Sequence, residues 1–185
     1  QEGSELSQLN RERVLTNPGP HFRKLLGLAV DLHARTLGYY QPAIHGAWTW
    51  LENRGSTADL KEDPRWNEQF DASDLKYLDI QANGSIRLLN PLTRLSMNAI
   101  GQGYLADVVA SHLLAAGVVS GLLHLGESYA IGRHPEGRFW KLAVTGTPAN
   151  GETGLLGNIE FSDAGLAVSA QDADRLLIDP VSRSV

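Results

Sequence analysis

One stretch, residues 95–132, constrains the fold of this chain more than any other: LSMNAIGQGYLADVVASHLLAAGVVSGLLHLGESYAIG. Gly101 and Gly103 flank Gln102 near its start, and a glycine backbone can adopt positive φ and approach a ligand closely. We therefore expect a tight glycine turn at this point. A glycine turn that leads into a helix favours anion binding, because free N–H groups and the positive end of the helix dipole face the ligand.

The residues after this turn predict a helix followed by a strand. Apolar side chains recur at helical spacing and form one stripe, made of Leu105, Val108, Val109, Leu113 and Ala116. Gly117 stands where a helix-ending glycine belongs, and Val118–Leu125 is typical of a mostly buried strand. We expect this unit at the centre of a sheet, with the glycine turn open to the main cleft. Most glycine turns before helices are simple connectors, so the motif alone identifies no function.

The N-terminal half predicts two helices and a hairpin. Residues 1–10 hold a single helical turn that Ser4 can cap. A longer helix, which Gly38 ends, follows from one apolar face made of Phe22, Leu25, Leu26, Ala29, His33 and Leu37. Residues 75–89 are typical of a hairpin around Asn83-Gly84, the strongest short hairpin signal.

The C-terminal half predicts several short strands. An alternating strand is expected at 139–144, a glycine-rich loop at 147–157, and two further strands at 158–161 and 165–169. Helices and strands thus alternate without a strict βαβ rhythm. This pattern favours an α+β fold, a layered sheet-and-helix single domain that covers residues 1–185.

Composition excludes several classes of function. A net charge of −5 without a Lys/Arg cluster gives no indication of nucleic-acid binding. The chain has no cysteine, which excludes disulfides, thiolate zinc sites and cysteine nucleophiles. Its six histidines form no HExxH or HxxxH pair, and no GxSxG elbow or GxxxxGK[ST] loop is present. The residues alone therefore indicate an α+β domain with a possible phosphate-binding turn.

Three sequence blocks resemble the ApbE family of FAD:protein FMN transferases. They are SELSQLN at Ser4–Asn10, NAIGQGYLAD at Asn98–Asp107 with its continuation LLAAGVVSGLLHLGES, and LLIDP at Leu176–Pro180. The turn that contains Gly38 is similar to another family motif. The blocks stand in the family's order, and the resemblance runs through nearly the whole chain.

The resemblance implies an activity, its substrates and its site residues. Enzymes of this family cleave FAD at the pyrophosphate and attach FMN through a phosphoester to a Ser or Thr of an acceptor protein, with Mg²⁺ as the metal. Such a phosphoryl transfer depends mainly on positioning and charge neutralisation. By position, the family's flavin contacts correspond to Tyr39, Tyr40, Gln41, Ser96, Gln102 and Leu177. The metal-binding position corresponds to Ala99, whose backbone carbonyl would be the ligand; no catalytic residue is assigned.

The chain differs from the family pattern at several of these positions. Gln102 stands where the family usually has Lys or an acid, Gln41 replaces an Asp, and Leu176 replaces a His. Three hypotheses therefore stay open. The chain is a flavin transferase, a non-catalytic flavin- or nucleotide-binding module that has lost the metal site, or a structural domain in which the glycines only allow tight packing.

Two expectations concern sequence outside the chain. The resemblance implies a periplasmic protein, or one anchored on the outer face of the cytoplasmic membrane by a segment ahead of Gln1. It also implies that a later Asp and Thr, past Val185, complete the metal site. We therefore expect residues 1–185 alone to bind Mg²⁺ weakly and to transfer FMN slowly or not at all.

Overall fold

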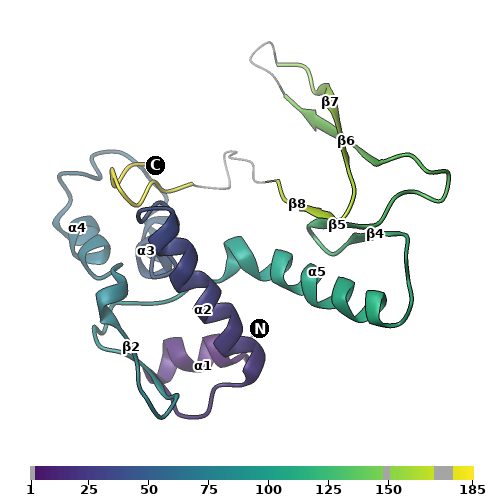
Figure 1. The fold of residues 1–185 in the computed structure, drawn as a ribbon. Coiled ribbons are helices and arrows are strands. Elements are labelled where there is room, and N and C mark those ends of the chain that lie inside the picture. The colour runs from purple at the N-terminus through teal and green to yellow at the C-terminus, as the bar shows by residue number, and fades with distance from the viewer. Residues whose placement is uncertain (1–2, 148–150, 169–176) are drawn as a thin grey trace. The chain divides into compact units, whose positions relative to one another are not determined.

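The computed structural model describes residues 3–147, 151–168 and 177–185 of the chain, and these form two compact units (Figure 1). The first unit contains residues 3–99 and 177–185, and the second contains residues 100–147 and 151–168. Both units mix helices with antiparallel strands, so the predicted α+β class is confirmed. A single domain over residues 1–185 stays a prediction. The described helices include none that is both long and apolar enough to span a membrane.

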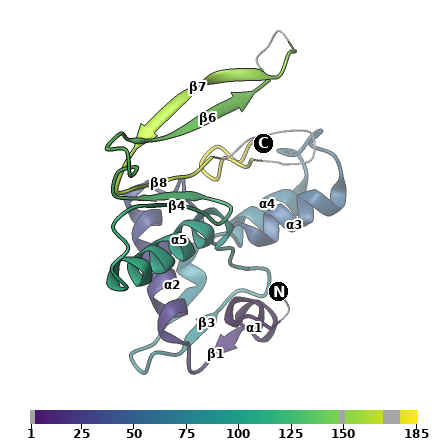
Figure 2. The ribbon, with the colours of Figure 1, turned by 90° about the vertical axis from the view of Figure 1, so that its right-hand side faces the viewer.

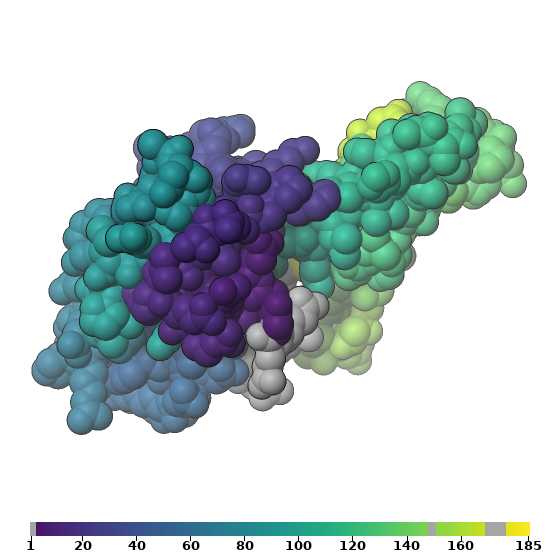
Figure 3. Space-filling model, turned by 90° about the horizontal axis from the view of Figure 1, so that it is seen from below, coloured from purple at the N-terminus to yellow at the C-terminus, as the bar shows by residue number. Residues whose placement is uncertain are grey.

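The first unit begins with two helices, α1 (Glu5–Glu12) and α2 (Pro20–Arg35), which lie at its surface in purple in Figure 3. The predicted cap is confirmed, because the Ser4 side chain accepts a hydrogen bond of 3.2 Å from the Ser7 N–H. Helix α2 ends two residues earlier than its apolar pattern suggests. Leu37 adopts φ 53° and is 85% exposed, so its place in the predicted apolar face was wrong.

Two further helices, α3 (His45–Arg54) and α4 (Pro64–Asp71), enclose an apolar cluster of the first unit. The cluster is centred on Trp66, which is fully buried and lies edge-on to Phe70 with ring centroids 4.7 Å apart. Its other members are Ala47, Leu51 and Leu60, with Ile44, Trp50 and Ile178 packed against it. Burial of these aromatic and aliphatic side chains stabilises the α3–α4 pair.

A small antiparallel sheet completes the first unit, in the order β1 (Val14–Leu15), β3 (Ile86–Leu88), β2 (Leu78–Ile80). A 3₁₀ turn, η1 (Leu75–Tyr77), leads into β2. The predicted hairpin is confirmed, with Leu78 opposite Leu88 and Gly84 at φ 83° in the turn. Strand β1 was not predicted, because two residues are too short to show an alternating pattern.

The second unit contains most of the longest helix, α5 (Asn98–Ala115). The glycine turn predicted at Gly101–Gly103 is wrong, because both residues lie inside this helix and neither has positive φ. No atom lies within 4 Å of the place where a Cβ would stand at either glycine, so close approach does not explain them. The end of the helix is confirmed: Gly117 has φ 88°.

The strands of the second unit form two antiparallel arrangements. One sheet has the order β4 (Gly121–His124), β5 (Ser128–Ile131), β8 (Ala164–Leu166). Among the described residues, β6 (Trp140–Gly146) pairs with β7 (Gly154–Phe161) alone, and Figure 2 shows this pair as a long ribbon. Strand β4 is therefore at an edge and not at the predicted centre of a sheet. The predicted loop at 147–157 is also too long, since β7 already begins at Gly154.

Candidate functional site

A pocket of about 360 Å³ in the first unit brings together residues 39–48, 96–99 and 177–180, which are distant in sequence. Its walls come from the turn after α2, from the start of α3, from the residues around the start of α5, and from the C-terminal segment. Its lining residues are Tyr39, Tyr40, Gln41, Ile44, His45, Trp48, Ser96, Asn98, Ala99, Leu177, Ile178 and Pro180. Five of the six predicted flavin contacts and the predicted metal position are among them. A volume of this size lies within the range of small-molecule sites.

The turn that carries Tyr39 and Tyr40 is built from the end of α2. Thr36 donates its hydroxyl to the Leu32 carbonyl at 2.8 Å and accepts the Tyr40 N–H at 3.0 Å. The His33 Nδ1 lies 2.8 Å from the Tyr40 carbonyl. These bonds tie Tyr40 to the last turn of α2 and fix its backbone at the pocket.

The segment that carries Ser96 is fixed against this turn. The Ser96 N–H donates to the Pro42 carbonyl at 2.8 Å, and Ile44 and Arg94 form a parallel β-bridge beside it. Asn10 binds both backbone groups of Leu95: its Nδ2 donates to the carbonyl and its Oδ1 accepts the N–H, each at 2.8 Å. The last residue of the SELSQLN block thus holds the strand-like segment that precedes α5.

Burial changes the chemistry of Tyr40. Its hydroxyl is buried, and no described residue gives it a hydrogen-bond partner. Desolvation raises the pKa of the Tyr40 phenol to about 12, so the hydroxyl stays protonated at neutral pH. A buried polar group without a partner is costly, and a hydrogen-bond acceptor on a bound ligand would satisfy it. Tyr40 lines the pocket, and its buried hydroxyl becomes available as a donor only if a ligand displaces the atoms that cover it.

Sequence reasoning missed His45, which lies at the first position of α3 and lines the same pocket. Its ring stacks with Trp48, with centroids 6.2 Å apart and planes inclined by 17°. Burial lowers the pKa of His45, and the nearby Arg94 lowers it further, while Glu52 acts in the opposite direction. The imidazole is consequently neutral at pH 7. The sequence carries only a weak signal for His45: Trp48 follows three positions later, a spacing that places both rings on the same face of a helix.

The predicted contact Gln102 is not among the residues that line this pocket. It is in the second unit, where its side-chain amide packs at Gly126, a residue with φ 91°. A Cβ at Gly126 would lie 2.6 Å from the Gln102 Nε2. Gln102 thus covers the turn between β4 and β5, and its role toward a flavin stays a prediction. Leu176, at the start of the LLIDP block, lies outside the described residues.

The residues present do not by themselves fit a magnesium site. Mg²⁺ requires near-octahedral oxygen ligands, usually with carboxylates among them. Ala99 lies in the first turn of α5, where a carbonyl is directed at the N–H four residues later in the same helix. Across residues 3–147, 151–168 and 177–185, no group of three or more His, Asp or Glu side chains could hold a metal. No chemical step is therefore assigned to a metal here.

Comparison with known proteins identifies the family to which this chain belongs. A family model described as "ApbE family" matches residues 1–180, so the chain belongs to the ApbE family. The resemblance seen in the three sequence blocks is thereby confirmed. No match was found among curated protein sequences.

Several solved structures have a similar fold. They include the flavin transferase ApbE from Vibrio cholerae (19% identity, TM-score 0.76, covering 100% of this chain and 62% of that one). The Pseudomonas stutzeri flavinyl transferase ApbE in its apo form is also similar (22%, 0.76, 100% and 59%). So is the ApbE protein from Thermotoga maritima (16%, 0.78, 99% and 63%). The chain spans about three fifths of the length of these proteins.

Proposed function

We propose that this chain contributes the flavin-binding part of an FAD:protein FMN transferase. The observation that carries the proposal is the pocket in which Tyr39, Tyr40, Gln41, Ser96 and Leu177 meet. Its volume of about 360 Å³ suits a planar ring system better than a whole dinucleotide. We therefore assign the isoalloxazine ring of FAD to this pocket.

The lining residues have complementary tasks toward such a ring. The aromatic rings of Tyr39 and Trp48 offer stacking surfaces, each worth about 0.5–1.5 kcal/mol beyond area burial. The Tyr40 hydroxyl donates to a ring carbonyl or nitrogen. The Gln41 Oε1 already accepts the Ala43 N–H at 3.1 Å, which leaves the amide N–H groups of Gln41 free to donate to the ligand.

The proposed reaction is a phosphoryl transfer. The hydroxyl of a Ser or Thr on an acceptor protein attacks the phosphorus on the FMN side of the pyrophosphate. The bond to the bridging oxygen breaks, FMN stays on the acceptor as a phosphoester, AMP leaves, and the hydroxyl proton is released to solvent. Residues of this chain hold the ring in place so that the pyrophosphate is presented to the acceptor. An extracytoplasmic location remains part of the proposal.

Flavin binding is tested by the quenching of FAD fluorescence. We expect binding on the order of tens of micromolar. Removing one neutral hydrogen bond costs about 0.5–1.5 kcal/mol, so Tyr40→Phe should weaken binding roughly two- to twelvefold. Tyr77→Phe is the matched control, because Tyr77 is outside this pocket. Absence of quenching by the native chain would refute the pocket assignment.

A second candidate function is a flavin-binding module without catalytic activity. The observation that favours it is the lack of a carboxylate set for Mg²⁺ among the described residues. The assay that separates the two candidates measures AMP release and FMN incorporation into an acceptor peptide that contains a Thr, with and without Mg²⁺. A module that only binds flavin would quench FAD fluorescence and release no AMP.

A further inference from the structure

The C-terminal segment of the first unit is held by one residue with an unusual backbone conformation. Arg183 has φ 59°, in the left-handed region that is unfavourable for side chains other than glycine. Such a conformation persists where surrounding contacts fix it. The contacts that do so here come from helix α4 and from hydrogen bonds within the turn itself.

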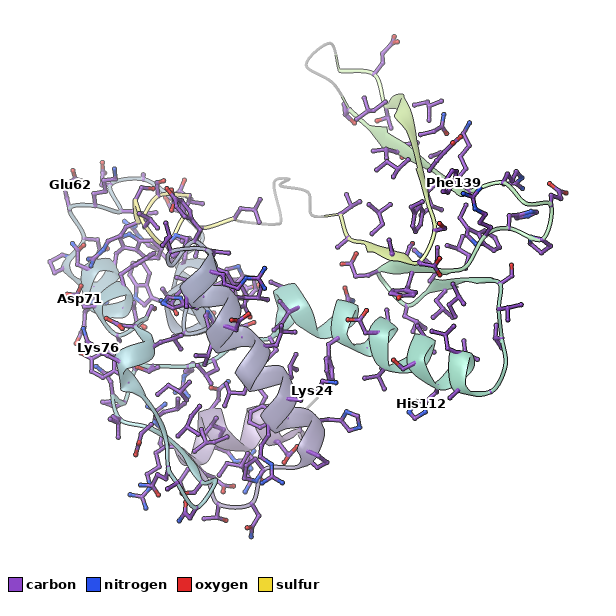
Figure 4. All side chains as sticks on the ribbon, in the orientation of Figure 1. Lys24, Glu62, Asp71, Lys76, His112 and Phe139 are labelled. Atoms are coloured by element: carbon purple, nitrogen blue, oxygen red, sulfur yellow. The ribbon has the colours of Figure 1, made fainter. Side chains whose placement is uncertain are left out.

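Three residues of α4 contact Arg183 through different atoms. The Trp66 Nε1–H donates to the Arg183 carbonyl at 3.3 Å, and the Arg183 guanidinium lies over the Phe70 ring, 5.5 Å from its centroid. The guanidinium also donates to the Asp71 carboxylate, with Nη2 and Oδ1 2.8 Å apart. Asp71 is labelled on α4 in Figure 4. Residues 66 and 70 lie on one face of the helix, and Asp71 is its last residue.

The turn that ends in Arg183 is also tied internally. The Asp179 carboxylate accepts the N–H groups of Val181 and Ser182 and the hydroxyl of Ser182. The Asp179 N–H donates to the Ser184 carbonyl at 2.8 Å, and the Arg183 N–H donates to the Asp179 carbonyl at 2.9 Å. The segment 179–184 is therefore one closed turn whose attachment to α4 runs through Arg183.

This turn continues directly from a wall of the flavin pocket. Leu177, Ile178 and Pro180 line the pocket, and Ile178 also packs against the apolar cluster around Trp66. A change in the attachment of Arg183 to α4 would consequently displace three lining residues. Neither Arg183 nor Asp71 lines the pocket itself.

We propose that Arg183 and Asp71 act as a latch that holds the Leu177–Pro180 wall in place and thereby sets the affinity of the pocket. Both are positioning residues, since neither lines the pocket. The effect on flavin rests on the proposed function, whereas the latch itself does not. If binding requires the closed latch, the apparent affinity is proportional to the closed fraction.

The salt dependence of riboflavin binding distinguishes the latch from a general loss of stability. None of the twelve lining residues is Lys, Arg, Asp or Glu, and His45 is neutral at pH 7. Riboflavin is uncharged, so salt would have little direct effect on its binding. The Asp71–Arg183 pair is exposed, with 67% and 43% of the side chains accessible, and salt weakens such pairs. Riboflavin affinity should therefore fall about two- to fourfold at high salt.

The test is a charge exchange on residues 1–185. Asp71→Arg or Arg183→Asp should weaken riboflavin binding roughly three- to tenfold, because attraction is replaced by repulsion. The double variant Asp71→Arg/Arg183→Asp should restore binding to within about twofold and keep the salt dependence. The control is Glu136→Arg, which reverses a comparably exposed pair, with Arg138 in the second unit, and should not change riboflavin binding.

Amide hydrogen exchange of residues 177–184 tests the latch without flavin. Exchange should be faster in both single variants, return to the native rate in the double variant, and stay native in Glu136→Arg. If exchange in the single variants equals that of the native chain, the latch is refuted. If the native chain exchanges as expected but riboflavin does not bind, the proposed function fails and the latch stands.

Discussion

Gly46, the second residue of α3, should not tolerate even one added methyl group. A Cβ at this position would stand 2.7 Å from the Leu92 carbonyl oxygen, about 0.7 Å inside the 3.4 Å at which ordinary contact begins. The Leu92 backbone cannot easily retreat. Its own N–H is bound by Asn90 at 2.9 Å, and the next residue, Thr93, is buried and donates its hydroxyl to the Ala72 carbonyl at 2.6 Å.

Two opposing effects determine how far Gly46→Ala changes the free energy of unfolding. Overpacking of a rigid site costs about 1–3 kcal/mol. Alanine in a helix recovers about 0.5–1 kcal/mol of the entropy that glycine loses on folding. The free energy of unfolding should therefore fall by up to about 2.5 kcal/mol, which for a chain of this length lowers the Tm by up to roughly 10 °C.

A matched substitution isolates the steric part of this argument. Gly27 lies in the interior of α2, and no atom lies within 4 Å of the place where its Cβ would stand. Gly27→Ala should accordingly raise the Tm, by about 1–4 °C. Both variants are measured by thermal unfolding followed by circular dichroism. Equal stabilisation in Gly46→Ala and Gly27→Ala would show that the Leu92 carbonyl does not crowd this site.

Three further predictions follow from individual groups. Burial raises the pKa of the Tyr40 phenol to about 12. Its contribution to the free energy of unfolding should therefore be fully present below pH 10 and decrease between pH 10 and about 12, because unfolded chains release the proton first. Tyr40→Phe should remove this decrease in alkaline unfolding curves. The hydrogen bond from the Ser182 hydroxyl, with those from the Val181 and Ser182 N–H groups, lowers the pKa of Asp179 below its usual 3.8. Its contribution is present above that usual value and lost as pH falls through the lowered pKa, which hydrogen exchange at residues 181–182 measures. Asn10→Ala leaves both backbone groups of the fully buried Leu95 without their partner and should cost about 2–4 kcal/mol in denaturant titrations. Asn67→Ala, which removes an exposed bond to the Lys61 carbonyl and a long, part-buried bond to the Asp63 carbonyl, should cost under about 1 kcal/mol.

The features that the sequence predicted correctly are those that depend on a few neighbouring residues. Ser4 caps α1 through its own side chain, and Asn83-Gly84 turns the hairpin because glycine accepts φ 83° there. Gly117 ends α5 for the same reason. In each case the physical cause acts within about four residues, so no knowledge of the remaining fold is required.

The start of α5 was mispredicted because the preference of glycine for turns is weak compared with the stability of a long helix. Gly101 and Gly103 lower helix stability by about 1 kcal/mol each relative to alanine, which suggested a turn. The helix nevertheless begins at Asn98, whose N–H donates to the Ser96 hydroxyl at 3.2 Å. Sixteen further residues of this helix outweigh the two glycines. Ser96 is a typical start signal, and giving it more weight would have placed the helix correctly.

The pocket could not be derived from local pattern at all. Tyr39 and Leu177 meet there across most of the chain, and only the resemblance to the ApbE family placed them together. His45 was missed because it matched no motif. Gln102, which was also taken from a family motif, lies in the second unit, and its role toward a flavin stays a prediction.

Asn10 explains how separate sequence blocks become one site. A short block such as SELSQLN resembles a local cap or turn when it is considered alone. Ser4 and Asn10 are the first and last residues of this block. Ser4 makes a local bond within α1, but Asn10 reaches across 85 residues to both backbone groups of Leu95. Leu95 immediately precedes Ser96, whose own N–H is bound by Pro42 beside the Tyr39–Gln41 turn. One amide side chain thus joins the first block to the segment that leads into the second, because an Asn side chain can both donate to and accept from the backbone of one residue.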